Sequence, residues 1–134
     1  MDWTDADLQG ATLSGSNLNG TTLVGVNLNN ARVGHTGLVG AKLQRVTLRR
    51  AYLVAAFLSH ADLTGVDLTK ADLRHADLRY AVLRDAGMVG SNLKDADLRH
   101  ADLSGAIVTG CLYDHRTRWP GGFDPVRHGA VLVK

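Results

Sequence analysis

The sequence predicts an all-β solenoid, a tube built from short repeats stacked along one axis. Three observations predict it: a five-residue unit recurs without insertion, each unit has a large aliphatic residue at its centre, and a small residue lies two places before that centre. The unit is clearest in the stretch Ala71–Tyr80, which reads Ala-Asp-Leu-Arg-His and then Ala-Asp-Leu-Arg-Tyr. A period of five fits neither a helix nor a flat strand, so the chain must turn within every unit.

The unit keeps its phase from Ala6 to Gly110, in 21 consecutive copies. Its centre is Leu in 18 copies, and the small position is Ala in 14. Repeats of such a short fixed period are stabilised by the neighbours on which they stack. We therefore predict that the central and small positions point inward and the other three outward. The core leucines predicted in this way include Leu43, Leu63, Leu73, Leu78 and Leu98.

The number of units in one coil is indicated by three bulkier residues at the small position. Val26, Val46 and Val66 occupy it at intervals of 20 residues, as expected if they stack in one column. This spacing predicts four units per coil and a square tube.

The repeat resembles the pentapeptide-repeat family, whose loose consensus is Ala-Asp/Asn-Leu-x-x. Six units carry Ala-Asp-Leu at their first three places, and they begin at Ala6, Ala61, Ala71, Ala76, Ala96 and Ala101. The resemblance implies a right-handed quadrilateral β-helix with four pentapeptides per coil and a short C-terminal cap. The expected organisation is a first unit at 1–5, a β-helix over 6–115 and a capping tail over 116–134.

The two ends of the tube are expected to be covered, because a solenoid end exposes unpaired backbone and apolar core. Trp3 is too large for a site inside the tube, so we predict a lid on the first coil; a partner-binding Trp is the alternative. Tyr113 is the last residue that fits the central position.

The tail from Arg116 to Pro125 is similar to the segment that often closes pentapeptide-repeat proteins. Trp119 and Phe123 are predicted to fold over the last coil, while the two prolines, which cannot donate to a strand ladder, end it. A ligand site is the alternative for this segment. Residues 126–134 either complete the cap or pair with another chain.

Composition limits the other functional classes. A chain of 134 residues corresponds to one domain, and its single cysteine, Cys111, excludes an internal disulfide. The N-terminal stretch has no basic start followed by an apolar run, so we expect a protein of the cytoplasm, without membrane contact. The family resemblance implies a bacterial protein. The formal net charge of +2 neither requires nor excludes a nucleic acid, and none is expected as a partner.

Two groups of outward residues are candidates for an interaction surface. The first is a basic edge for an acidic partner, with a solvated face as the alternative; it consists of Lys42, Arg45, Arg49, Arg50 and Lys70. The second is an exposed apolar patch, which often marks an interaction site; it consists of Val39, Tyr52, Val54 and Phe57.

Catalytic, metal and cofactor sites are not predicted. All 13 acidic residues are Asp, whose short carboxylate reaches backbone amides at turns. His60, Tyr80 and His100 are expected to stack in one column, with the histidines too far apart to share a metal ion. His75 is expected to meet Asp95 one coil further on, with no nucleophile beside them.

These observations predict a non-catalytic structural or protein-interaction module, because a filled tube offers no concave pocket for an active site. The alternative, taken from the resemblance, is a mimic of duplex DNA that binds DNA gyrase or topoisomerase IV and confers drug or toxin resistance. Such mimics resemble long, acidic, dimeric rods, whereas this chain is shorter and slightly basic. We expect a protein partner, with the chain itself a monomer or an end-to-end homodimer.

Overall fold

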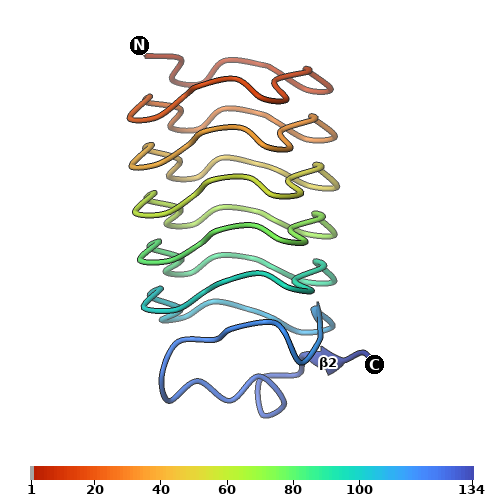
Figure 1. The fold of residues 1–134 in the computed structure, drawn as a ribbon. Coiled ribbons are helices and arrows are strands. Elements are labelled where there is room, and N and C mark those ends of the chain that lie inside the picture. Colours follow the sequence, from red (N-terminus) through yellow and green to blue (C-terminus); the bar gives the residue numbers. More distant parts are fainter. Residues whose placement is uncertain (1) are drawn as a thin grey trace.

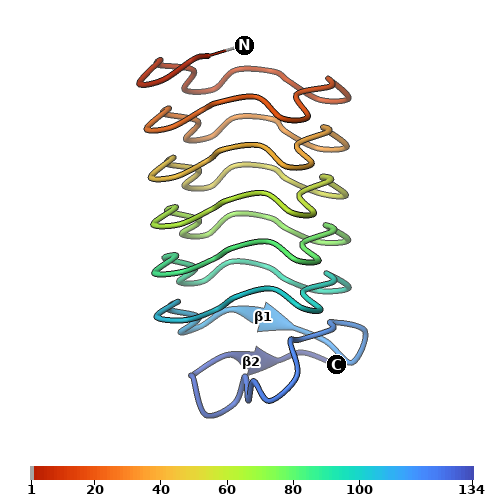
Figure 2. The same cartoon turned by 90° about the vertical axis from the view of Figure 1, so that its left-hand side faces the viewer.

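The computed structural model describes residues 2–134 as a tube of stacked coils, with the two chain ends at opposite ends of the tube (Figure 1). Parallel bridges join residues 20 positions apart, from Asp2 with Thr22 to Asn92 with Leu112. Since each unit has five residues, one coil contains four units, as predicted. A view turned by 90° shows the same regular stack of coils (Figure 2). Residues 2–134 include no helix that could cross a membrane.

The chain turns at every fifth residue, and each turn has the same backbone conformation. The last residue of every unit from Asp5 to Gly110 has a positive φ, between 54° and 72°. This left-handed region favours Gly, yet 13 of these corner residues are not Gly. The coil geometry therefore imposes the corner conformation even on residues such as Tyr80 and Lys70.

The bridges sort the outward residues into four faces, which we number in chain order. Each face is defined by the residue that precedes the centre of its units. Face 1 carries Asp7, Asn27, Thr47, Asp67, Gly87 and Ile107; face 2 carries Thr12, Arg32, Tyr52, Asp72, Asn92 and Leu112; face 3 carries Asn17, Gly37, Phe57, Asp77, Asp97 and Arg118; face 4 carries Asp2, Thr22, Lys42, Asp62, Val82 and Asp102.

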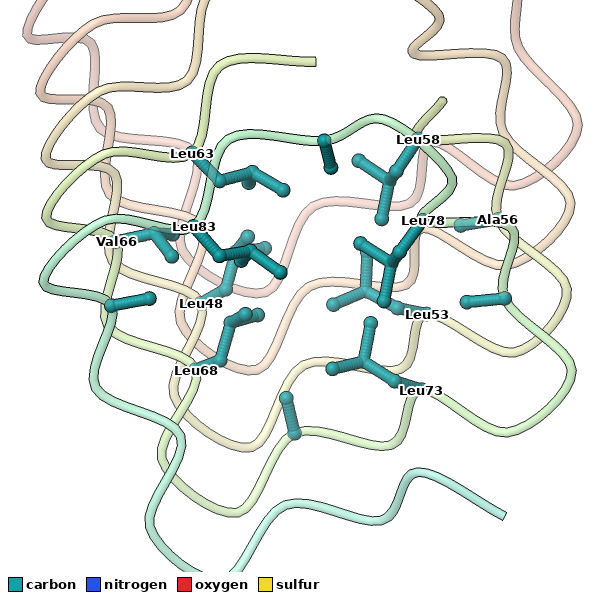
Figure 3. Packing of buried hydrophobic residues seen from close by; sticks show 14 of the residues in the cluster. Leu48, Leu53, Ala56, Leu58, Leu63, Val66, Leu68, Leu73, Leu78 and Leu83 are labelled. Carbon is teal, nitrogen blue, oxygen red and sulfur yellow. The ribbon is translucent and has the colours of Figure 1, made fainter. Parts of the chain in front are cut away.

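The interior is a column of aliphatic side chains. Figure 3 shows Leu63 and Leu83 of face 4, one coil apart, pointing into the interior toward Leu58 and Leu78 of the adjacent face 3. The five predicted core leucines, Leu43, Leu63, Leu73, Leu78 and Leu98, are all fully buried. Burying a Leu side chain contributes roughly 1.5–3 kcal/mol by transfer, so this column is the main source of stability.

The stacked valines predicted from the sequence are present. Val26, Val46 and Val66 lie at the small position of face 1, and all three are at most 1% exposed. The unit of Val46 therefore packs directly between those of the other two.

The last 20 residues close the tube with one irregular coil. The register slips by one residue after Leu112, because Asp97 bridges Arg118, which is 21 positions further on. Strand β1 (Leu112–Tyr113) then pairs in parallel with strand β2 (Val131–Leu132), which is the last strand of the chain. Of the two alternatives for residues 126–134, the structure has pairing within the same chain, on face 2.

Aromatic rings pack against one another within this closing coil. Tyr113 is buried, and its ring meets Trp119 edge-on at a centroid distance of 5.5 Å. Phe123 stacks on Trp119 at 5.1 Å, and His128 stacks on Phe123 at 4.6 Å. At the other end, Trp3 is partly buried against the core, while Met1 of that unit lies outside the described residues.

Candidate interaction surfaces

The aspartates and asparagines on the faces have a structural role in most units. In the unit of Asp62, one carboxylate oxygen accepts bonds from the Thr64 backbone N–H at 3.1 Å and the Thr64 hydroxyl at 2.6 Å. The same bond, from the N–H two residues later, recurs at Asn17, Asn27 and many other units. A short polar side chain at this position thus satisfies a backbone donor that the ladder leaves free.

Where an Arg lies two residues after the Asp, its side chain also binds the carboxylate. Arg79 donates from Nε to one oxygen of Asp77 at 2.9 Å and from Nη2 to the other at 2.8 Å. Arg99 and Asp97 repeat the arrangement one coil further on. The hydrogen bond from its arginine holds the pKa of each carboxyl below its usual range. Both guanidinium groups are therefore fixed on the flat surface of face 3.

The five cations predicted to form one basic edge are divided between two adjacent faces, 4 and 1, and the corners that follow them. Lys42 lies on face 4, Arg45 at the corner after it, and Arg49 on face 1, where it pairs with a carboxylate of the next coil at 3.1 Å. Only Arg50 and Lys70 stack, at the corner after face 1. The expectation of a shared edge is wrong, because residues five apart occupy successive sides of the coil rather than one side.

The predicted apolar patch is divided into two pairs around a corner. Tyr52 and Val54 lie on face 2, whereas Val39 and Phe57 lie on face 3. Three of these side chains are well exposed, at 44% for Tyr52, 49% for Phe57 and 37% for Val39.

Tyr52 borders a hollow on face 2. An added Cβ on Gly34 would lie 2.8 Å from the ring of Tyr52, so the absence of a side chain there leaves room for the ring. Arg32 and Ser14 complete the lining of the hollow, whose volume is about 340 Å³. The ring of Tyr52 is thus laid against the tube rather than projecting from it.

Face 3 also carries Tyr80, which the sequence predicts in a column of rings but not in an interaction surface. Tyr80 lies at the corner of face 3 and is 50% exposed. It stacks between His60 and His100 at ring-centroid distances of 4.9 and 4.8 Å, which confirms the predicted column. The interval of 20 residues that places Tyr80 in this column also places it one coil beyond the unit of Phe57. We call the set formed by Val39, Phe57, Arg79, Tyr80 and Arg99 the face 3 patch.

The predicted pair of His75 and Asp95 is present in the structure. His75 Nδ1 lies 2.6 Å from an oxygen of Asp95, as expected from the sequence. No group of three or more His, Cys, Asp or Glu side chains gathers around a common point among these residues. Cys111 is buried, and its thiol lies 2.9 Å from the Met88 carbonyl oxygen. Burial raises the pKa of this thiol, which keeps it protonated.

A coil of four short units, with an apolar core and its functional groups on outward faces, defines a β-helical repeat scaffold. A family model described as pentapeptide repeats matches residues 4–36, 41–79 and 76–112, in eight copies. The chain therefore belongs to the pentapeptide-repeat family. A search of curated proteins gave no match.

Solved structures of the same family share this fold. The chain is similar to the pentapeptide repeat protein Rfr23 from the cyanobacterium Cyanothece 51142, with 26% identity over 87% of this chain and 89% of that one, and a TM-score of 0.70. It is also similar to HetL from Nostoc sp. strain PCC 7120, a protein involved in heterocyst differentiation regulation, with 30% identity and a TM-score of 0.60. That match covers 82% of this chain and 58% of HetL, so this chain spans little more than half of that relative.

Proposed function

We propose that this protein is a non-catalytic module that binds another protein through the face 3 patch. Family membership and the similarity to Rfr23 and HetL support a repeat scaffold, and we take its coil to be the right-handed quadrilateral β-helix that the family resemblance implies. In this scaffold Trp3 and residues 116–134 act as caps.

The composition of the patch carries the proposal. Aromatic residues and Arg are enriched at protein interfaces and among the residues that contribute most to binding. Phe57 and Tyr80 are each about half exposed, and their two units stack directly on one another on face 3. A monomer gains nothing from exposing two such side chains together, whereas a partner would bury both.

The rigidity of the patch supports binding as well. Arg79 and Arg99 are each held by two bonds to a carboxylate, so neither side chain must be ordered when a partner docks. Tyr80 is stacked on both sides. Preorganised side chains reduce the entropy lost on binding, which leaves more of the contact energy as affinity.

The proposal is tested with a double substitution, Phe57→Ser and Tyr80→Ser, in protein used to capture partners from a lysate of the native host. Tyr52→Ser is the matched control, since Tyr52 is similarly exposed but lies on face 2. We expect a captured protein with the wild type and the control, and its loss with the double variant at an unchanged melting temperature. Capture by all three proteins alike would contradict the proposed surface.

Mimicry of duplex DNA at a type II topoisomerase remains the alternative partner hypothesis. The formal net charge of +2 disfavours it, because a DNA mimic must present negative charge. A supercoiling assay with DNA gyrase decides: inhibition or protection at micromolar protein would favour the topoisomerase as partner, and we expect neither.

A further inference from the structure

The closing coil leaves two sides of the tube without a continued ladder. After residue 112 the chain rebuilds face 3 at Arg118 and face 2 at Val131, but no bridge continues face 4 beyond Asp102 or face 1 beyond Ile107. On face 1 the tail covers the edge, since Gly110 N–H donates to Gly129 C=O and Val108 is 1% exposed. Pro120, which has no N–H to donate, and the two glycines after it lie at the point where the chain would have entered face 4. The segment Ala101–Gly105 is therefore an open strand edge.

The preceding coil shows which backbone hydrogen bonds are missing at this edge. There, Leu83 N–H donates to Asp102 C=O at 2.8 Å, Asp85 N–H donates to Ser104 C=O at 2.9 Å, and Ala81 C=O accepts from Asp102 N–H at 2.9 Å. The corresponding groups of the open edge are the N–H groups of Leu103 and Gly105 and the C=O group of Ala101. None of these three groups has a hydrogen-bond partner among residues 2–134.

The core column is also interrupted at this edge. Leu23, Leu43, Leu63 and Leu83 are fully buried at the central position of face 4, whereas Leu103 is only partly buried. A hollow of about 370 Å³ lies against it, between Ala101–Gly105 on one wall and Pro120–Phe123 with His128 on the other. The hollow thus combines an apolar floor with a row of free backbone groups.

The side chains that line the hollow already have partners. Asp102 accepts bonds from Arg84 Nε at 2.6 Å and from the Ser104 hydroxyl at 2.6 Å. His128 Nδ1 lies 2.8 Å from the Asp124 carbonyl oxygen, and its ring stacks on Phe123. The free hydrogen-bonding capacity along the strand-edge wall is therefore that of the main chain, which an extended backbone satisfies and a compact polar ligand does not.

From these observations we infer that the Ala101–Gly105 edge binds an extended peptide segment of a partner protein by strand addition. The segment donates one N–H to Ala101 and accepts from Leu103 and Gly105. Its side chain between these backbone contacts enters the hollow over Leu103, so a medium-sized aliphatic residue is required there. This site is at the end of the tube and is independent of the face 3 patch.

The chain itself provides the probe. In the preceding coil, the unit Ala81–Asp85 makes the same three bonds to the unit Ala61–Gly65. It makes them through Val82 N–H, Val82 C=O and Arg84 C=O. An acetylated and amidated peptide with the sequence of residues 79–87 therefore carries the right backbone spacing and an aliphatic residue, Leu83, at the right place. Two control peptides are a version N-methylated at the Val82 nitrogen and a version with Leu83→Asp.

Amide hydrogen exchange of the full chain, followed by NMR, is the measurement. Without peptide, the Leu103 and Gly105 amides should exchange far faster than those of Leu83 and Asp85, which are paired. With the peptide at ten times its Kd, exchange of the two open-edge amides should slow about tenfold, and neither control should protect them at that concentration. Protection that is equal with all three peptides, or slow exchange without peptide, would overturn the inference. Protection that rises with protein concentration alone would also overturn it, since the occupant would then be a second copy of the chain.

Discussion

Arg79 and Asp77 point the same way from one unit of face 3, and both oxygens of the carboxylate accept a bond from the guanidinium, at 2.9 and 2.8 Å. The same carboxylate also accepts the backbone N–H of Arg79 at 3.1 Å. One Asp thus orders both the turn of the chain and the charged side chain beside it.

This relationship predicts a loss of stability in acid. The hydrogen bonds from their arginines lower the pKa of Asp77 and Asp97 in the folded state, and the Ser104 hydroxyl together with Arg84 lowers that of Asp102 to about 2. A carboxyl with a lowered folded pKa contributes stability that is complete above its unfolded pKa of about 3.9 and is lost as the pH falls through the folded value. Stability should therefore decline between about pH 4 and pH 2.

Urea denaturation at several pH values measures this decline. A variant with Asp77→Asn and Asp97→Asn keeps an oxygen for the backbone bond but lacks the titrating group, so its stability should fall less steeply in the same range. Parallel pH profiles of the two proteins would contradict the role given to these carboxylates. Because both side chains are partly exposed, each pair is worth only about 0–1 kcal/mol.

A second prediction separates the energetic cost of a left-handed backbone from the cost of fitting an added side chain. Gly15 is a corner residue with a φ of 72°, and Gly87 lies on face 1 without a positive φ. An added Cβ would meet nothing within 4 Å at Gly15 and nothing closer than 3.9 Å at Gly87. Gly15→Ala should lower the free energy of unfolding by roughly 1 kcal/mol because of the left-handed backbone. Gly87→Ala should be neutral or stabilising by about 0.4–1 kcal/mol.

Thermal or urea unfolding of the two Gly variants, side by side, provides the test. Equal effects of both substitutions would mean that the corner conformation has no energetic cost in this coil.

The aromatic cap gives a third prediction. Trp119 packs between Tyr113 and Phe123, but its buried indole N–H has no hydrogen-bond partner among residues 2–134. Trp119→Phe keeps the ring packing and removes the unpaired donor, so its effect on stability should be small or favourable. Trp119→Ala should cost roughly 3 kcal/mol and should loosen β2, detected as faster exchange of the Val131 and Val133 amides. A costly Trp119→Phe would show that the N–H has a partner in solution.

The regular part of this fold could be predicted from the sequence because one rule applies to every unit. Leu43 and Leu63 are inward because they are centres, and Val26, Val46 and Val66 stack because they are 20 apart. A shared basic edge does not form, because Arg45 and Arg50 are five residues apart and therefore lie at successive corners of the coil.

Trp119 and Phe123 predict a cap, but the path of the closing coil could not be predicted because the period ends there. The single-residue slip before Arg118 and the return of Val131 to face 2 depend on how the aromatic rings pack, and no repeat encodes them. The open edge at Leu103 follows from that return. Similarly, the repeat predicts the column that contains Tyr80, but the position of Tyr80 next to Phe57 depends on which units share face 3.

The 20-residue register is the basis of every surface described above, and engineered cysteines test it most directly. Val39 and Ser59 are 20 positions apart at equivalent positions of face 3, about 4.8 Å apart in a stack of this kind, which suits a disulfide. Under oxidation, a protein with Val39→Cys and Ser59→Cys should form an intramolecular disulfide, measured by thiol titration and intact mass. The matched pair Val39→Cys and Val54→Cys, 15 positions apart and on different faces, should not. A disulfide in the second protein and free thiols in the first would contradict four units per coil.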